Sequence, residues 1–301
     1  MKSISFRIGG FACHTVDAGS QRLDGGAMFG VVPKPLWEQR IPADERNRIP
    51  LALRCLLIEH PAGPVLVDTG VGNKESSKFT DIYAVENSGD PGPTRLEDSL
   101  ATLGFTPLDI KYVINTHLHF DHCGGNTVID VKNGHGDMMA VPQLAFPEAT
   151  YVVQRGELAF ARAPGERAAA SYLAPNFEPI DAADRWQLID GEAEILSGIR
   201  ALPTPGHVPH HQSVVISDGG ETGCFVGDLI PTAAHLPPAW IMGYDLEPLV
   251  TLATKKALLD RAARENWVLI LEHEPGPGTG RVVRDGKRFV FMPLDTPPGA
   301  G

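Results

Sequence analysis

The sequence has no long apolar run and no cluster of basic residues, and each absence excludes a class of protein. No stretch approaches the ~20 consecutive apolar residues that cross a bilayer, so we expect no membrane segment. The first 19 residues also lack the apolar run of a signal peptide, which favours a cytoplasmic location. A net charge of -11 gives no cationic surface for phosphates, so nucleic acid is not an expected partner.

Cysteine is also scarce, and the few residues present are far apart. They form no C-x-x-C pair, which argues against a zinc ribbon and is typical of a reduced chain. The four are Cys13, Cys55, Cys123 and Cys224. Cys123 lies beside the histidine-rich segment described below, and we expect it to be a small buried thiol.

Glycine and proline are spread along the whole chain, which predicts one domain over residues 1–301, built from short strands and helices joined by turns. Thr94 and Glu97 form a capping-box pattern at the start of one predicted helix. Two groups of strands with helices after each predict an α/β fold in which two sheets pack together with helices outside. The predicted strands are 3–9, 11–17, 54–59, 65–68, 111–115, 150–154, 186–189, 193–202, 213–217, 223–226 and 267–271, and the predicted helices are 94–103 and 247–264.

Residues 19–50 form a long segment rich in glycine and proline. Its apolar residues Met28, Phe29 and Trp37 look exposed. We therefore interpret the segment as a lid over a site or as an arm that contacts a second copy in a homodimer.

Four potential metal ligands occur within six residues: His117, His119, Asp121 and His122. Side chains alternate in an extended chain, so the first two histidines point the same way and can bind one metal together. The aspartate and histidine that follow are adjacent and more naturally bind a second metal. Gly124 and Gly125 then let the turn close. Imidazole with a few carboxylates suits zinc, and manganese, iron and cobalt also fit.

Three further candidate ligands come later in the chain, each at the end of a predicted strand: His207, Asp228 and His273. Sites assembled from loops are expected at such strand ends. The remaining histidines are expected on the surface or in packing, and they are His14, His60, His135, His210, His211 and His235.

The H-x-H-x-D-H segment with its later histidine, aspartate and histidine resembles the metallo-β-lactamase fold superfamily, from residues 66–70 to His273. The resemblance implies a four-layer αββα sandwich with the metals at one edge. It implies that one metal is held by His117, His119 and His207, the second by Asp121, His122 and His273, and that Asp228 bridges both. Asp68 matches an acid that lies behind the histidines and sets their tautomers.

Two metals can bridge a water and lower its pKa towards neutrality, which predicts a hydrolase that needs no serine or cysteine nucleophile. Within the superfamily, the residues look most like N-acyl-homoserine lactonases acting on a small molecule. Enzymes resembling methyl parathion hydrolase, which cleave organophosphorus triesters and aryl esters, are the alternative, with weak β-lactamase activity as a side reaction. A metal-binding protein without catalysis is a third hypothesis.

One departure bears on the choice between these hypotheses. Lactonases of this kind often carry a tyrosine three residues after the bridging aspartate, and here that position is Pro231. Tyr244 or His235 could take its place, so both join Asp121 and Asp228 as candidate catalytic residues. An apolar substrate cleft could be lined by Met28, Phe29, Trp37, Phe120 and Tyr244, with core or dimer packing as the other interpretation.

Overall fold

Two seven-stranded sheets dominate the structure, a computed structural model that describes residues 3–129 and 141–294. The first sheet has the spatial order β1 (Ser5–Ile8), β2 (Phe11–Asp24), β3 (Arg48–Glu59), β4 (Val65–Val67), β5 (Tyr112–Ile114), β8 (Thr150–Gln154) and β9 (Trp186–Ile189). The second has the order β10 (Ala193–Leu196), β11 (Ile199–Pro203), β12 (Gln212–Asp218), β13 (Glu221–Phe225), β14 (Val268–Ile270), β15 (Thr279–Asp285) and β16 (Arg288–Pro293). Two short strands, β6 (Thr127–Val128) and β7 (Gln143–Leu144), pair separately.

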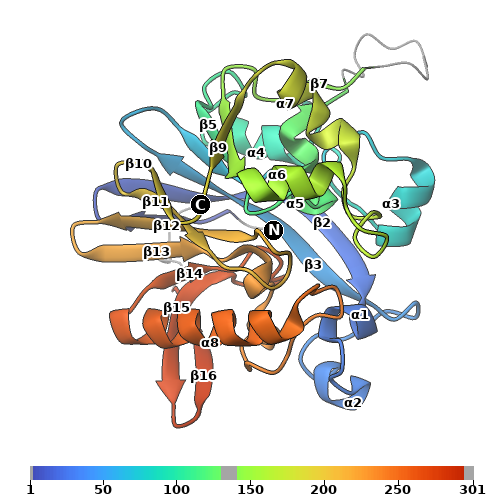
Figure 1. Ribbon diagram of the computed structural model, residues 1–301, viewed down its shortest axis with the longest axis vertical. Coiled ribbons are helices and arrows are strands. Elements are labelled where there is room, and N and C mark those ends of the chain that lie inside the picture. Colours follow the sequence, from blue (N-terminus) through green and yellow to red (C-terminus); the bar gives the residue numbers. More distant parts are fainter. Residues whose placement is uncertain (1–2, 130–140, 295–301) are drawn as a thin grey trace.

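Helices cover the outer faces of both sheets, which gives the four-layer αββα sandwich that the resemblance predicted (Figure 1). The long helix α8 lies over the second sheet, and α4, α6 and α7 lie on the side of the first. The α-helices are α1 (Gly25–Phe29), α2 (Lys34–Trp37), α3 (Ser77–Tyr83), α4 (Arg95–Thr102), α5 (Phe120–Cys123), α6 (Arg155–Arg162), α7 (Glu178–Ala182) and α8 (Pro248–Glu265). Four 3-10 turns are η1 (Gly124–Asn126), η2 (Ala174–Asn176), η3 (Gly227–Leu229) and η4 (Ala233–His235).

The central strands are apolar on both faces because the middle of each sheet is buried on both sides. In β3, Leu56 and Ile58 join the core between the sheets, whereas Cys55 and Leu57 face the layer that contains α4. In the second sheet, Leu269 of β14 faces the layer that contains α8. Alternating side chains therefore build three cores from two sheets, and the sheets are held rigidly between helices.

Most of the predicted elements are confirmed. The predicted strand at 193–202 is instead the hairpin β10–β11, because Gly198 turns the chain with a φ of 79°. The hairpin β15–β16 was not predicted, since many of its side chains are exposed and its alternation is weak. Helix α4 begins after Thr94 as predicted, although the threonine side chain makes no capping hydrogen bond.

The segment 19–50 is more regular than its composition suggested. Its start continues β2 and its end begins β3, with Ser20 paired to Ala52 and Asp24 to Arg48. Met28, Phe29 and Trp37 are buried, so the expectation of exposed apolar residues was wrong. They pack with apolar residues of β3 into a small core of their own. A role as lid or dimer arm stays a prediction.

All four cysteines are buried and unbonded, as expected of a reduced chain. Over the described residues, no helix combines the length and the hydropathy that a bilayer crossing requires.

Gly124 and Gly125 are needed for a reason other than the predicted one. Neither residue has a positive φ among the described backbone angles, so the turn itself does not require glycine. A Cβ on Gly124 would instead meet the carbonyl oxygen of Val71, and one on Gly125 would meet the carbonyl oxygen of Thr69. The two glycines let the segment after β4 pack directly against the segment that carries the histidines.

We therefore expect Gly124→Ala to lower the free energy of unfolding by about 1–3 kcal/mol, as overpacking against a fixed backbone does. Gly165→Ala is the matched control, because a Cβ there meets nothing within 4 Å. Urea unfolding followed by circular dichroism measures both. Equal midpoints for the two variants would contradict the packing explanation.

Candidate metal centre

The loops that carry the candidate ligands follow strands that run in the same direction within each sheet. In the first sheet, β5 lies between the parallel strands β4 and β8 and leads into His117. In the second, β13 and β14 are parallel, and β11 has the same direction because both β11 and β13 are antiparallel to β12. His207, Asp228 and His273 follow these three strands. Their carboxyl ends meet at one edge, so residues 156 positions apart in the sequence, from His117 to His273, converge there.

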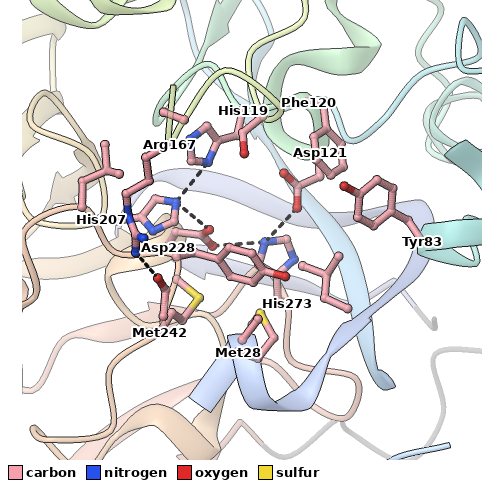
Figure 2. A pocket seen from close by; sticks show the side chains of 17 residues that line it. Met28, Tyr83, His119, Phe120, Asp121, Arg167, His207, Asp228, Met242 and His273 are labelled. Carbon is pink, nitrogen blue, oxygen red and sulfur yellow. Dashed lines mark hydrogen bonds and ion pairs between the residues drawn. The ribbon is translucent and has the colours of Figure 1, made fainter. Parts of the chain in front are cut away.

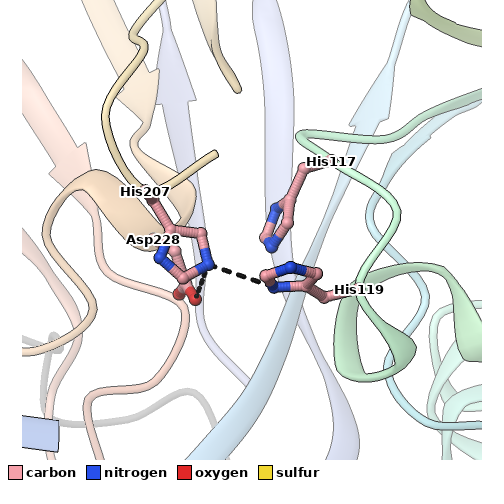
Figure 3. Close-up of side chains that lie close together, drawn as sticks. All are labelled: His117, His119, His207 and Asp228. Atoms are coloured by element: carbon pink, nitrogen blue, oxygen red, sulfur yellow. Dashed lines mark hydrogen bonds and ion pairs between the residues drawn. The ribbon is translucent and has the colours of Figure 1, made fainter. Parts of the chain in front are cut away.

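The candidate ligands form two adjacent groups. One contains His117, His119, His207 and Asp228, and its potential ligand atoms lie within 4.8 Å of one another (Figure 3). The other contains Asp121, His122 and His273. The structure therefore brings together all seven side chains named from the sequence, in the two groups that the resemblance implied.

Asp228 lies between the two groups. Its Oδ2 is 3.2 Å from His207 Nε2 and 3.5 Å from His122 Nε2, and its Oδ1 is 3.1 Å from His273 Nε2. One carboxylate thus faces nitrogens of both groups, which is the arrangement that a bridging ligand requires.

The donor set fits divalent cations. The Nε2 atom of His117 is buried and has no hydrogen-bond partner among the described residues. His119 Nδ1 lies 3.1 Å from His207 Nε2, and His122 Nε2 lies 3.3 Å from His273 Nε2. Nitrogens turned towards one another at these distances, next to two carboxylates, match the ligand chemistry of zinc and similar ions.

These side chains strongly shift one another's proton affinity. Burial, reinforced by neighbouring histidines, holds the pKa of His117 and of His119 well below the usual range. Burial opposes a charge on His273 too, but Asp228 outweighs it and raises the pKa of His273 to about 9. Burial also opposes ionisation of Asp228, yet His122, His273 and His207 together hold its pKa well below the usual value. Protons and metal ions therefore compete for the same atoms.

An acceptor lies behind the outer nitrogen of His122, of His207 and of His273. His122 Nδ1 lies 3.1 Å from Asp68 and 2.9 Å from Glu272. His207 Nδ1 lies 2.9 Å from Asp245, and His273 Nδ1 lies 2.8 Å from the carbonyl oxygen of Ala52. Such contacts orient the ring and select the tautomer that turns the inner nitrogen to a metal. Asp68 thus lies where the resemblance placed it.

Sequence reasoning missed three residues around the cluster. Gln21 in β2 donates a hydrogen bond to Asp121 Oδ2, Asp245 contacts His207, and Glu272 contacts His122. Glu272 offered a local signal, a carboxylate inside an apolar strand end, and burial raises its pKa to about 8. Gln21 and Asp245 contact partners that lie 100 and 38 positions away in the sequence, so no local pattern predicts them.

A cavity of about 340 Å³ opens onto the cluster (Figure 2). Met28, Phe120 and Tyr244 line it as predicted, together with ligand candidates of both groups. Phe29 and Trp37 do not line it; they stack on each other behind it, with ring centroids 5.2 Å apart.

The structure also corrects the prediction for His235. This histidine is fully buried and does not line the cavity. Its ring stacks on Phe29 at 4.4 Å, Nε2 lies 2.8 Å from the carbonyl oxygen of Met28, and Nδ1 lies 2.8 Å from Thr232 Oγ1. Both ring nitrogens thus have protein partners, and we assign His235 to packing. Of the other histidines outside the cluster, His135 lies outside the described residues, His211 is buried and His210 is exposed.

Comparison with known protein families identifies the fold. The profile of the metallo-β-lactamase superfamily matches residues 50–273, a span that holds both groups of candidate ligands. The chain belongs to this superfamily. The four-layer architecture and the position of the cluster at the sheet edge agree with membership in the metallo-β-lactamase superfamily.

Relatives within the superfamily include lactonases. An N-acyl homoserine lactonase of Bacillus thuringiensis is 32% identical over 241 residues, which cover 74% of this chain and 82% of that enzyme. Against two other Bacillus lactonases, each 33% identical, the chain spans less than two thirds of their length, 58% and 60%.

Two solved structures have the same fold. A probable metal-dependent hydrolase from Staphylococcus aureus has a TM-score of 0.84 and 29% identity, covering 96% of this chain and 100% of that one. A dizinc quorum-quenching lactonase in complex with a homoserine product has a TM-score of 0.77 and 22% identity, with 97% of both chains covered.

The contact between Asp245 and His207 generates a prediction about metal affinity. Asp245→Asn removes the charge that orients His207 and should weaken metal binding by about tenfold to a hundredfold. Competition with a chromogenic chelator measures the affinity. Asp190→Asn is the control, since its side chain is 70% exposed and pairs with Arg155 away from the cluster. An unchanged affinity in Asp245→Asn would exclude this role.

Proposed function

We propose that this chain is a metal-dependent hydrolase that opens lactone rings of the N-acyl-homoserine-lactone type, with two zinc ions as cofactor. The observation that carries the proposal is the position of Asp228, whose carboxylate faces His207 of one group and His122 and His273 of the other. Membership in the superfamily and the lactonase relatives support it.

In this proposal, His117, His119 and His207 hold one ion, and Asp121, His122 and His273 hold the other. Asp228 would be a ligand to both. When bound, the two ions lower the pKa of a water towards neutrality and polarise the oxygen of the substrate. Manganese, iron or cobalt would fit the same nitrogen and oxygen donors.

The protein's own groups then orient the reactants. Gln21 donates to one oxygen of Asp121, which fixes the plane of that carboxylate. We infer that Asp121, held in this way, orients the attacking water.

In this proposal Tyr244 supplies the phenol that the resemblance implies at the position of Pro231. It lines the cavity from the loop before α8, and its hydroxyl has no protein partner among the described residues. Burial raises the pKa of Tyr244 above its usual value, so the phenol keeps its proton at neutral pH and can donate to the substrate carbonyl.

The walls of the cavity fit an acyl group. Leu23, Ala27, Met28, Met242 and Leu246 give it apolar sides next to the polar cluster. A volume of about 340 Å³ lies within the range of roughly 300–1,000 Å³ that small-molecule sites occupy. A cytoplasmic location and a homodimer stay predictions.

The competing function is hydrolysis of organophosphorus triesters or aryl esters. Pro231 favours it, because those enzymes resemble this chain in lacking a tyrosine at that position. Weak β-lactamase activity and metal binding without turnover are further hypotheses that one substrate panel separates.

The decisive measurement is kcat/KM of zinc-loaded enzyme on acyl-homoserine lactones, simple γ- and δ-lactones, paraoxon-type triesters, aryl esters and a chromogenic β-lactam. We expect lactones to exceed all other classes. Asp228→Ala should lower the lactone value by more than about a hundredfold, since loss of a contact behind a ligand alone costs up to that much. Higher rates on triesters or aryl esters would establish the competing function, and bound metal without any turnover would favour the non-enzymatic hypothesis.

Tyr244→Phe tests the phenol separately. It removes one hydrogen bond and should lower kcat/KM on the lactone by roughly twofold to tenfold, while metal content stays unchanged. Tyr112→Phe, in β5 and away from the cavity, is the control. Identical kinetics for Tyr244→Phe and the unmodified enzyme would remove Tyr244 from the reaction.

A further inference from the structure

Arg167 is a pocket residue that the proposed reaction does not use. It lies between α6 and α7 and lines the cavity together with its neighbours Ala168 and Ser171. Of the described residues that line this cavity, Arg167 alone is an arginine or lysine. In Figure 2 a dashed line marks its hydrogen bond to a carbonyl oxygen drawn next to Met242, which is that of Gly243.

The charge of Arg167 has no counter-ion in the part of the chain that the structure describes. Two nearby arginines are paired, Arg155 with Asp190 and Arg162 with Asp181, both at less than 3.2 Å. Arg167 instead donates one hydrogen bond, from Nη2 to the carbonyl oxygen of Gly243 at 2.5 Å. A guanidinium has five N–H donors, so most of them stay free for a ligand. Arg167 is exposed, so its charge is solvated until a ligand enters the cavity that it lines.

Other unused donors lie in the same cavity. The hydroxyls of Ser171 and Tyr244 line it, and neither has a hydrogen-bond partner among residues 3–129 and 141–294. A carboxylate accepts hydrogen bonds only and fits a planar guanidinium in a two-pronged geometry. These donors are therefore complementary to a carboxylate, and apart from the candidate metal ligands the rest of the lining is largely apolar.

We propose that Arg167 is a specificity-determining residue that binds a carboxylate carried by the substrate away from the bond that is broken. The preferred substrates are lactones whose acyl group ends in an acid. This inference rests on the lactonase function proposed above and narrows its substrate class. The carboxylate that ring opening creates is a second source of the same chemistry, and the experiment separates the two.

The probes are two lactones of nearly equal size that differ in one group, the carboxylate of N-succinyl-homoserine lactone and the uncharged carboxamide of N-succinamoyl-homoserine lactone. We expect the unmodified enzyme to favour the acid by about tenfold to a hundredfold in kcat/KM, the range of a charge-assisted hydrogen bond. The difference should lie in KM, because the contact is present before and during the reaction.

Variants assign the preference to the side chain. In Arg167→Gln the ratio of the two values should fall to near one, with the amide substrate unaffected, and Arg167→Lys should be intermediate because it keeps the charge and loses the planar fork. Arg162→Gln removes an equal charge from neighbouring α6 and should behave as the unmodified enzyme. Equal use of both lactones by the unmodified enzyme would overturn the proposal. So would an equal loss on both in Arg167→Gln, which would leave only a structural contact with Gly243.

If neither lactone is hydrolysed, calorimetry measures the affinity of the enzyme for the two ring-opened products and tests whether Arg167 binds the remote carboxylate. Both products carry the carboxylate formed by ring opening, and only N-succinyl-homoserine has the remote one. Tighter binding of that product, lost in Arg167→Gln, supports the inference even where the lactonase function fails. Equal affinities, or an equal loss for both products, overturn it. Good hydrolysis of both lactones without preference leaves the proposed function standing and refutes this inference alone.

Discussion

Everything at this site depends on the burial of seven ionisable side chains in one small volume. Each of the five histidines and two aspartates is less than 9% exposed. Removing charges from water is costly unless they are paired. The pKa values in this cluster are therefore shifted in opposite directions: that of His117 is lowered and that of His273 is raised. The buried Nε2 atom of His117 has no hydrogen-bond partner among the residues that the structure describes. Divalent cations would satisfy the inward-facing nitrogens and the carboxylates together, which is why metal binding and folding are expected to be coupled.

The fold holds this cluster in place by joining the two sheets at the strand ends. β3 belongs to the first sheet, yet the backbone N–H groups of Ala52 and Arg54 donate hydrogen bonds to residues 273 and 272, which follow β14 of the second sheet. The buried guanidinium of Arg54 donates to the carbonyl oxygens of Leu271, Glu274 and Gly276. The carbonyl oxygen of the same Ala52 accepts a hydrogen bond from the outer nitrogen of His273. One strand therefore positions a candidate ligand that lies more than 200 residues away.

Features whose signal lies within a few neighbouring residues could be predicted from the sequence. Apolar strands, the H-x-H-x-D-H segment and the single ligands at strand ends could all be found, because each has its signal within a few residues. Gln21 and Asp245 could not, since their partners lie far along the chain. Burial of Trp37 was misjudged for a related reason: a glycine- and proline-rich composition says nothing about the separate core that Met28, Phe29 and Ile49 form around it. Gly124 was expected to let the turn close, whereas the structure indicates a different reason for glycine, the carbonyl oxygen of Val71 that a Cβ would meet.

The loop before α8 links metal binding to substrate choice. Asp245 orients His207, its neighbour Tyr244 lines the cavity, and Gly243 accepts a hydrogen bond from Arg167. Three consecutive residues thus contact the cluster, the cavity and the side chain that we propose reads the substrate. The resemblance to lactonases implies a tyrosine three residues after Asp228, where this chain has Pro231. If Tyr244 supplies the phenol instead, it enters the cavity from the residue next to Gly243, whose carbonyl oxygen accepts the hydrogen bond from Arg167. A change of loop, with the metal ligands kept, is then sufficient to alter which lactones the site accepts.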